Sequence, residues 1–232
     1  MRLGRKNEKI KNSVELVSLH IPKTAGTSFR NILKDVYGSG SVARLDIRRN
    51  IELNSKPLKS KKIKPGIRVL HGHFNYQKFM ESFDIAEGTP VITWLREPAE
   101  RVISNYFYLD KILRKELNEE KKDLNILAKM EKTLLEYAAT EANRNRMSKF
   151  LDGISPEEFY FIGLTEHYED DLAQLAKRLN WKSYSLHKHN ITGRKPGLDE
   201  ESLQKIRELN HDDYELYEHA LKLREERIKS GS

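Results

Sequence analysis

Short runs of β-branched and aliphatic residues recur along the chain, and most of them precede a segment with the spacing of an amphipathic helix. The runs lie at 15–20, 67–71, 90–95, 160–164 and 183–187. Strands that alternate with helices predict a parallel sheet covered by helices on both faces. We therefore expect one three-layer α/β domain over residues 1–232, with a central parallel sheet of about five strands.

The first predicted helix has the clearest apolar stripe. It is formed by Phe29, Ile32, Leu33, Val36 and Tyr37, and Gly38 follows where a left-handed cap would end the helix. A second helix is predicted from Pro98 to about Leu117, since proline is favoured in a first helical turn. Other helical patterns cover 124–139, 141–151, 166–180 and 199–229.

Two segments depart from the simple alternation of strands and helices. Residues 44–66 are rich in Lys and Arg, contain two prolines and show no clean period, so we expect a basic loop that is mobile or ordered by a partner. Residues 111–150 predict a helical insert that forms a lid or side wall. After it, the stretch 155–158 reads Ser-Pro-Glu-Glu, which has the form of a capping box.

Composition narrows the choice of partners without deciding it. Lys and Arg number 42 against 35 Asp and Glu, and the net charge of +7 suits an anionic cofactor, an acidic polymer or nucleic acid. The absence of cysteine excludes disulfides, a thiolate nucleophile and cysteine-ligated metal. No apolar run reaches the roughly 20 residues of a membrane span, and no signal peptide is recognisable, so we expect a cytoplasmic protein.

The segment from Leu16 to Ser28 predicts an anion site. A strand, a tight loop and a helix start follow one another, which directs free backbone N–H groups to one point. Gly26 allows close approach of an oxyanion, Thr27 and Ser28 add hydroxyl groups, and Lys23 adds a positive charge. An ordinary strand-to-helix turn with a hydroxyl cap is the alternative. The lysine precedes the glycine, unlike the nucleotide-kinase loop, so a metal-free phosphate site fits better.

A second strand-to-helix junction lies about seventy residues further along. Arg96 follows the strand at 90–95, and Ser104 comes eight residues later in the predicted helix. A guanidinium can hold a phosphate through two parallel N–H bonds, and a hydroxyl can take a third oxygen. Taken singly, Arg96 is equally compatible with a surface ion pair and Ser104 with a small packing residue.

Together the two junctions resemble the phosphate-binding segments of the sulfotransferases, in particular the heparan sulfate and uronyl 2-O-sulfotransferases. The resemblance implies a P-loop nucleotide-kinase-like fold, a single sulfotransferase domain, and 3′-phosphoadenosine 5′-phosphosulfate as donor with adenosine 3′,5′-bisphosphate as product. It assigns the 5′-phosphosulfate to Lys23, Thr24, Ala25, Gly26, Thr27 and Ser28, and the 3′-phosphate to Arg96 and Ser104. The stretch 190–197 looks like the basic loop that covers the nucleotide, which would add Arg194 and Lys195.

A His-Gly-His sequence ends the second predicted strand, at the sheet edge where parallel sheets bind ligands. The resemblance implies that His73 is the base, that His71 supports it and that Lys23 stabilises the leaving oxygen. Without the flanking signatures, both histidines would be read as core or strand-end residues. The acceptor is expected to be a hydroxyl, most simply of a saccharide that can itself be anionic. Asn75, Tyr76, Lys78, Asn143 and Arg146 are expected on the acceptor side.

Two other classes of function remain open from the residues alone. The pairs His71-x-His73 and His187-x-His189 suit a zinc hydrolase, although no Asp or Glu follows at the usual spacing. The basic charge suits a non-enzymatic nucleic-acid binder, although no binding motif is recognisable. Neither class explains both phosphate signatures, so we expect no bound metal and no nucleic-acid partner.

Overall fold

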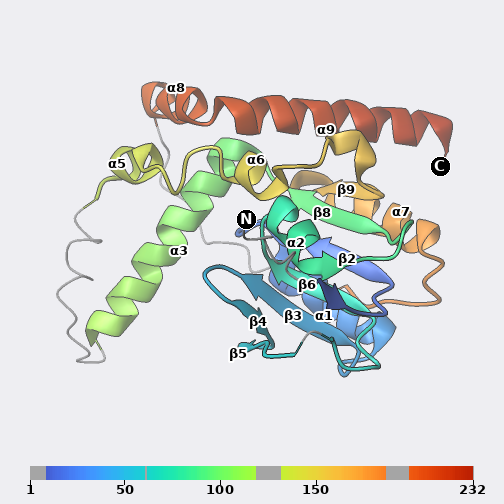
Figure 1. The fold of residues 1–232 in the computed structure, drawn as a ribbon. Coiled ribbons are helices and arrows are strands. Elements are labelled where there is room, and N and C mark those ends of the chain that lie inside the picture. The colour runs from blue at the N-terminus through green and yellow to red at the C-terminus, as the bar shows by residue number, and fades with distance from the viewer. Residues whose placement is uncertain (1–8, 61, 119–131, 187–198, 232) are drawn as a thin grey trace, which may run out of the picture.

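The computed structural model describes residues 9–60, 62–118, 132–186 and 199–231. Within them, a seven-stranded sheet has the order β5-β4-β3-β6-β2-β8-β9 (Figure 1). Its five neighbouring parallel strands are β3 (Val42–Ile47), β6 (Val69–His73), β2 (Leu16–Leu19), β8 (Val91–Leu95) and β9 (Phe161–Leu164). The antiparallel strands β4 (Ile51–Leu53) and β5 (Lys56–Pro57) extend one edge, and β1 (Ile10–Lys11) pairs separately with β7 (Phe83–Asp84).

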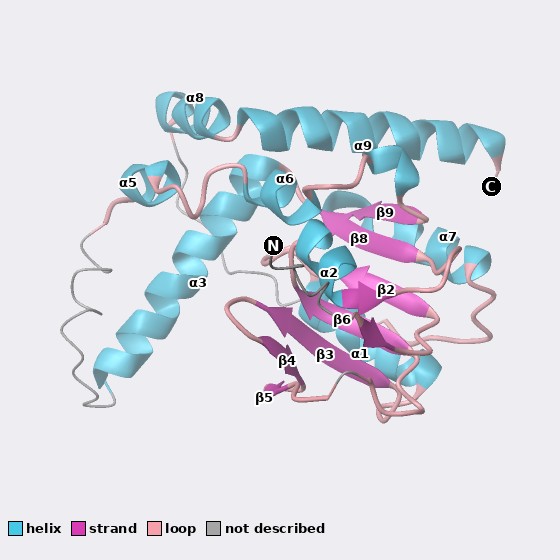
Figure 2. Cartoon of the chain, in the orientation of Figure 1, coloured by secondary structure: helices cyan, strands magenta, loops and turns pink. Residues whose placement is uncertain are grey.

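Helices cover both faces of the sheet (Figure 2). Leu16 and Val69 pack into one core together with α1 (Gly26–Tyr37) and α7 (Tyr168–Arg178). The next residues along the same strands, Val17 and Leu70, pack into the core that includes α2 (Tyr76–Ser82), α6 (Arg146–Leu151) and α9 (His211–Ser230). Alternate strand residues thus face opposite helical layers, as expected for a sheet buried on both sides. The predicted three-layer α/β class is confirmed.

A third apolar cluster lies beside the sheet. It joins α3 (Pro98–Asn118), α5 (Leu134–Ala139) and α8 (Glu200–Leu209) through Val102, Ala138 and Ile206. The helix α3 begins at Pro98, as predicted, and runs outward from the sheet (Figure 1). Short 3-10 turns cover Pro156–Glu158, with the predicted capping box at Ser155, and Thr165–His167. No helix of the described residues is long and apolar enough to cross a bilayer.

One strand prediction and one loop prediction were wrong. Residues 183–186 form no strand, and His187 lies outside the described residues. The fifth parallel strand is β3, which occupies the start of the segment predicted as the basic loop 44–66, and β4 and β5 follow in the same segment. The two charged residues of β3 pair with each other, since Arg44 Nε lies 2.7 Å from Asp46 Oδ2. This ion pair lets a strand with two charged positions lie inside the sheet.

Several helix boundaries also differ from the prediction. The segment 199–229 forms two helices, which are separated at Asn210, and the buried side chain of Asn210 accepts a hydrogen bond from Asn145 N at 3.1 Å. The predicted helix 141–151 begins only at Arg146, and the first half of the predicted helix 124–139 lies outside the described residues. The helix α2 was not predicted. Gly38 ends α1 as predicted, but its ψ of 138° with φ of 87° is not left-handed helical.

Candidate active site

The β2–α1 loop has the backbone shape expected of an anion cradle. Lys23 and Ala25 adopt positive φ values of 75° and 62°, and the helix starts at Gly26. The first N–H groups of a helix have no intrahelical acceptor, so those of Gly26, Thr27 and Ser28 are directed out of the amino end of α1. Thr24 has another task, because its hydroxyl donates to the Ile21 carbonyl at 2.9 Å and fixes the loop.

The second junction contacts this loop directly. Arg96 follows β8 and donates through Nη1 to the Lys23 carbonyl at 3.4 Å, while Nη2 lies 3.2 Å from Glu100 Oε2. The ammonium of Lys23 lies 3.8 Å from the ring centroid of Tyr108 on α3. Burial, and next the charge of Arg96, lower the pKa of Lys23. The structure therefore places two cations from separate strand ends side by side.

The remaining described residues of the predicted nucleotide site differ in how far they are buried. Ser28 is buried and Thr27 exposed at the start of α1. Ser104 lies on α3 with only 1% of its surface exposed, so its hydroxyl belongs to the interior of the fold. Arg194 and Lys195 lie outside the described residues.

A stack of three histidines lies at the carboxyl ends of β2 and β6. The ring of His20 lies 5.0 Å from that of His71 and 4.3 Å from that of His73, centroid to centroid. His71 Nδ1 is 2.9 Å from the Ser18 hydroxyl. Burial, followed by the charge of His73, lowers the pKa of His71 to about 3, so this imidazole is neutral at physiological pH. A histidine in this state orients its neighbours better than it accepts protons.

His73 has the geometry of a general base. Its Nδ1 lies 2.7 Å from the carbonyl oxygen of His20, and since a carbonyl only accepts, Nδ1 carries the proton. The lone pair of the neutral ring is then on Nε2. Burial lowers the pKa of His73, and the hydrogen bond to His20 opposes this shift. The ring is therefore neutral near neutral pH, with its single proton on Nδ1 and with Nε2 able to take a second proton.

His20 was not among the residues singled out from the sequence. A Cβ atom on Gly26 would lie 1.9 Å from His20 Nε2, so the imidazole fills the space that the glycine leaves. The requirement for glycine was read as space for an oxyanion. In the structure that space holds the His20 ring. The role of His20 could have been suspected from its position, because a histidine at the end of a buried strand is unusual.

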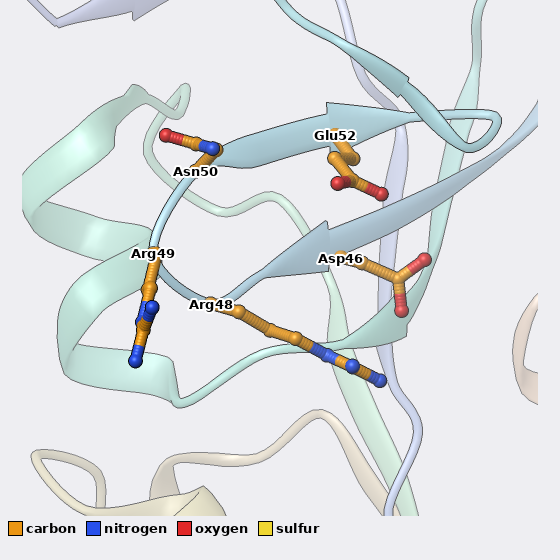
Figure 3. Close-up of a pocket in the computed structure, with 5 residues that line it drawn as sticks. All are labelled: Asp46, Arg48, Arg49, Asn50 and Glu52. Carbon is orange, nitrogen blue, oxygen red and sulfur yellow. The ribbon is translucent and has the colours of Figure 1, made fainter. Parts of the chain in front are cut away.

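Charged residues of the β3–β4 hairpin and of α1 lie around the histidines. Asp46 is opposite His73 in the parallel register and is 6% exposed. A pocket of about 300 Å³ is lined by Asp46, Arg48, Arg49, Asn50 and Glu52. In Figure 3, Arg48 extends to the side where Asp46 lies, whereas Arg49 points away from it. These residues were missed because their segment was read as a loop.

Two side chains expected at the acceptor site have structural tasks instead. Asn75 caps α2 by accepting from Lys78 N at 3.0 Å, and its amide donates to the Lys149 carbonyl. Asn143 is buried and donates to the Tyr137 carbonyl at 2.9 Å. Arg146 is only partly committed, since Nη1 donates to the Ala142 carbonyl while Nε has no partner among the described residues.

The comparison with known protein families decides the assignment. The sequence model described as "Sulfotransferase family" matches residues 9–220, nearly the whole chain. The chain belongs to the sulfotransferase family. Both strand-to-helix junctions of the chain and its histidine stack fall inside the matched region.

Curated relatives match part of this chain. Heparan sulfate 2-O-sulfotransferase 1 of Gallus gallus is 31% identical over 109 residues, which cover 42% of this chain and 30% of that protein. The Homo sapiens protein of the same name is 33% identical over 100 residues, which cover 38% of this chain and 27% of the relative. The aligned part thus spans less than a third of these relatives.

Two solved sulfotransferases are structurally similar at low sequence identity. One, from Alicyclobacillus acidocaldarius, aligns with a TM-score of 0.42 at 14% identity and covers 86% of this chain and 96% of its own. The other, mouse SULT7A1 complexed with PAP, has a TM-score of 0.37 at 11% identity and covers 84% of this chain and 62% of its own.

The described residues offer little for the zinc alternative. They contain no group of three or more His, Asp or Glu side chains arranged to hold a metal ion. In the pair His71 and His73, Nδ1 contacts the Ser18 hydroxyl and the His20 carbonyl respectively, an arrangement that is also usual in metal-bound histidines and does not separate the two classes. His189, and with it the second His-x-His pair, lies outside the described residues.

Proposed function

We propose that this protein transfers a sulfuryl group from 3′-phosphoadenosine 5′-phosphosulfate to a hydroxyl group of a carbohydrate. The observation that carries the proposal is the contact between the two strand-to-helix junctions, where Arg96 donates to the Lys23 carbonyl. The histidine stack lies beside the same loop, since the strand β2 that leads into it pairs with β6. Family membership supports the reaction class.

The described residues include groups suited to bind a doubly phosphorylated nucleotide. The amino end of α1 supplies backbone N–H donors for the 5′ end, and Lys23 supplies a charge that burial has already partly desolvated. Arg96 has a planar fork suited to a phosphate, and its Nη2 also lies 3.2 Å from Glu100 Oε2. Arg194 and Lys195 stay a prediction for the 3′ side.

The reaction requires one proton transfer and one exchange of bonds at sulfur. The acceptor hydroxyl oxygen forms the new S–O bond as the bond between sulfur and the 5′-phosphate oxygen breaks. His73 Nε2 takes the hydroxyl proton, and Lys23 stabilises the charge that develops on the departing phosphate oxygen. His71, neutral and held by Ser18, supports the orientation of the stack. The products are a sulfate ester, adenosine 3′,5′-bisphosphate and a proton.

The acceptor is proposed to reach His73 from the β3–β4 side. The pocket beside Asp46 is next to His73 in the sheet and carries both basic and acidic groups, which suits a hydroxyl-rich ligand. The curated relatives are named for heparan sulfate, and on this ground a saccharide is the acceptor class we propose.

Calorimetric titration with adenosine 3′,5′-bisphosphate tests the donor site, with adenosine 5′-monophosphate as the matched ligand that lacks the 3′-phosphate. We expect binding of the bisphosphate and much weaker binding of the monophosphate. Transfer of labelled sulfate to desulfated heparan oligosaccharides then tests the reaction. His73→Ala should reduce turnover by roughly 10²–10⁴, whereas the exposed His211→Ala should not change it. Equal affinity for the two nucleotides, or tight binding of nucleic acid in place of both, would refute the proposal.

A further inference from the structure

His20 connects the anion loop to the base by three separate contacts. Its backbone N–H donates to the Gly72 carbonyl at 2.8 Å, and its carbonyl accepts from His73 Nδ1. Its ring packs on that of His73 at 4.3 Å with an interplanar angle of 31°. On its other side, the ring fills the space above Gly26, at the start of α1.

We propose that the imidazole of His20 is a positioning residue that fixes the orientation of His73 and couples it to the amino end of α1. The inference rests on the proposed function, in which His73 is the base. It concerns the side chain of His20, because the carbonyl that holds Nδ1 is present whatever residue occupies the position.

One hydrogen bond does not fix an imidazole ring. The bond from Nδ1 to the His20 carbonyl sets one direction, and rotation of the His73 side chain can still break it. The His20 ring, which packs against the face of His73, supplies the second constraint. The His71 ring lies 5.0 Å from the His20 ring and restricts how far His20 can move. With both constraints in place, Nε2 of His73 points in one direction, and in-line transfer depends on this alignment.

The contact with Gly26 makes the stack sensitive to the anion loop. A Cβ at position 26 would also lie 2.0 Å from His20 Cδ2, so no side chain fits there while His20 keeps its place. The glycine is thus required by the His20 ring itself. Displacement of the start of α1 would move His20 and, through it, His73.

The electrostatic surroundings keep His20 neutral, so it acts by packing. Burial first, then His71 and His73 on β6, Arg44 on β3 and Arg30 on α1 lower its pKa well below the usual value. Asp46 on β3 acts in the opposite direction on His73.

The first test is a measurement on His73 that needs no turnover. Long-range proton–nitrogen NMR correlations report which imidazole nitrogen carries the proton. In the unaltered protein we expect His73 in the Nδ1–H form, and in His20→Ala an exchanging mixture of both forms. His211→Ala is the control. If His20→Ala fails to fold, His20→Gln replaces it, since it removes the ring and keeps a polar side chain.

The second test is kinetic. His20→Ala should lower kcat by about 10²-fold through misalignment and leave the affinity for adenosine 3′,5′-bisphosphate within about threefold. Because His20 acts through His73, the double variant His20→Ala/His73→Ala should be no slower than His73→Ala alone. An Nδ1–H form preserved in His20→Ala with unchanged kcat, or additive losses in the double variant, would overturn the inference.

The third test separates the two roles of Gly26. Gly26→Ala should lower Tm by about 4–8 °C, and His20→Ala/Gly26→Ala should recover most of that loss. No recovery would mean that the glycine serves something other than His20. Failure of the proposed function has a different signature, in which the unaltered protein neither binds the bisphosphate nor transfers sulfate, while the NMR and Tm tests still report on His20.

Discussion

A buried carboxylate at the start of α9 allows a quantitative prediction about stability. Asp213 is 0% exposed and accepts hydrogen bonds from Met147 N at 3.1 Å, Ser148 N at 2.8 Å and the Ser148 hydroxyl at 2.9 Å. Its Oδ2 also lies 3.8 Å from Nε of Arg101, which is itself fully buried on α3. One side chain therefore joins α3, α6 and α9.

Removal of this carboxylate leaves a buried charge and two buried N–H groups without their partner. Breaking one side of a buried ion pair costs about 3–5 kcal/mol, and Asp213→Ala should lower the free energy of unfolding by about this amount. Asp213→Asn should cost less, because one amide oxygen can still accept. For a chain of this size the Ala variant should melt roughly 6–20 °C lower.

Urea unfolding followed by circular dichroism measures the change, with the neighbouring exposed Asp212→Ala as the matched control. The control loses one hydrogen bond to Asn145 and should cost about 1 kcal/mol or less. The double variant Arg101→Met/Asp213→Leu, which removes both charges, should recover much of the loss. A cost below about 1 kcal/mol for Asp213→Ala would show that the pair contributes little net stability.

Four further outcomes are expected. Arg96→Ala should weaken binding of adenosine 3′,5′-bisphosphate about 10-fold or more in calorimetry, while Lys23→Ala should mainly reduce turnover. If Lys23→Ala weakened binding and Arg96→Ala reduced only turnover, the two roles would have to be exchanged. Because the pKa of His73 is lowered, kcat/KM should fall with acid only below the usual histidine pKa of 6.5. Asp46→Asn removes a charge that raises this pKa, so the acid limb should move to lower pH, and movement to higher pH would contradict the assignment. Gly72→Ala places a Cβ 1.8 Å from the Leu45 carbonyl oxygen and should lower the free energy of unfolding in urea by about 1–3 kcal/mol or more. Unchanged stability would show that β3 and β6 can move apart at this position.

The part of the fold that could be predicted from the sequence is the part that is apolar. Strands β2, β8 and β9 are mostly apolar, β6 starts with an apolar pair before its histidines, and the stripe on α1 is equally plain. Strand β3 escaped recognition because Arg44 and Asp46 interrupt its pattern, and their charges cancel only once the two side chains meet. The division of the last helix at Asn210 depends on a contact with Asn145, which is distant in sequence.

The candidate site shows the same limit. The two strand-to-helix junctions could be located because they follow from local order, a strand end before a helix start, and their role in phosphate binding stays a proposal. Asn75 and Asn143 were expected to contact the acceptor, yet their amides serve the backbone, and the sequence does not distinguish a cap from a ligand contact. His20 gains its importance from Gly26 and His73, and the second of these is 53 residues away.

Two arginines beside the histidine stack influence the proposed base. Burial lowers the pKa of His73, and the charges of Arg44 and Arg48 add to this shift, so the imidazole is neutral before the proposed reaction begins. Neutrality is a requirement for a general base, because a protonated ring has no lone pair to offer. Arrival of a polyanionic donor would offset the positive field and raise the affinity of His73 for a proton at the stage when it has to accept one. The arginines of the β3–β4 hairpin therefore help to set the protonation state of the proposed base.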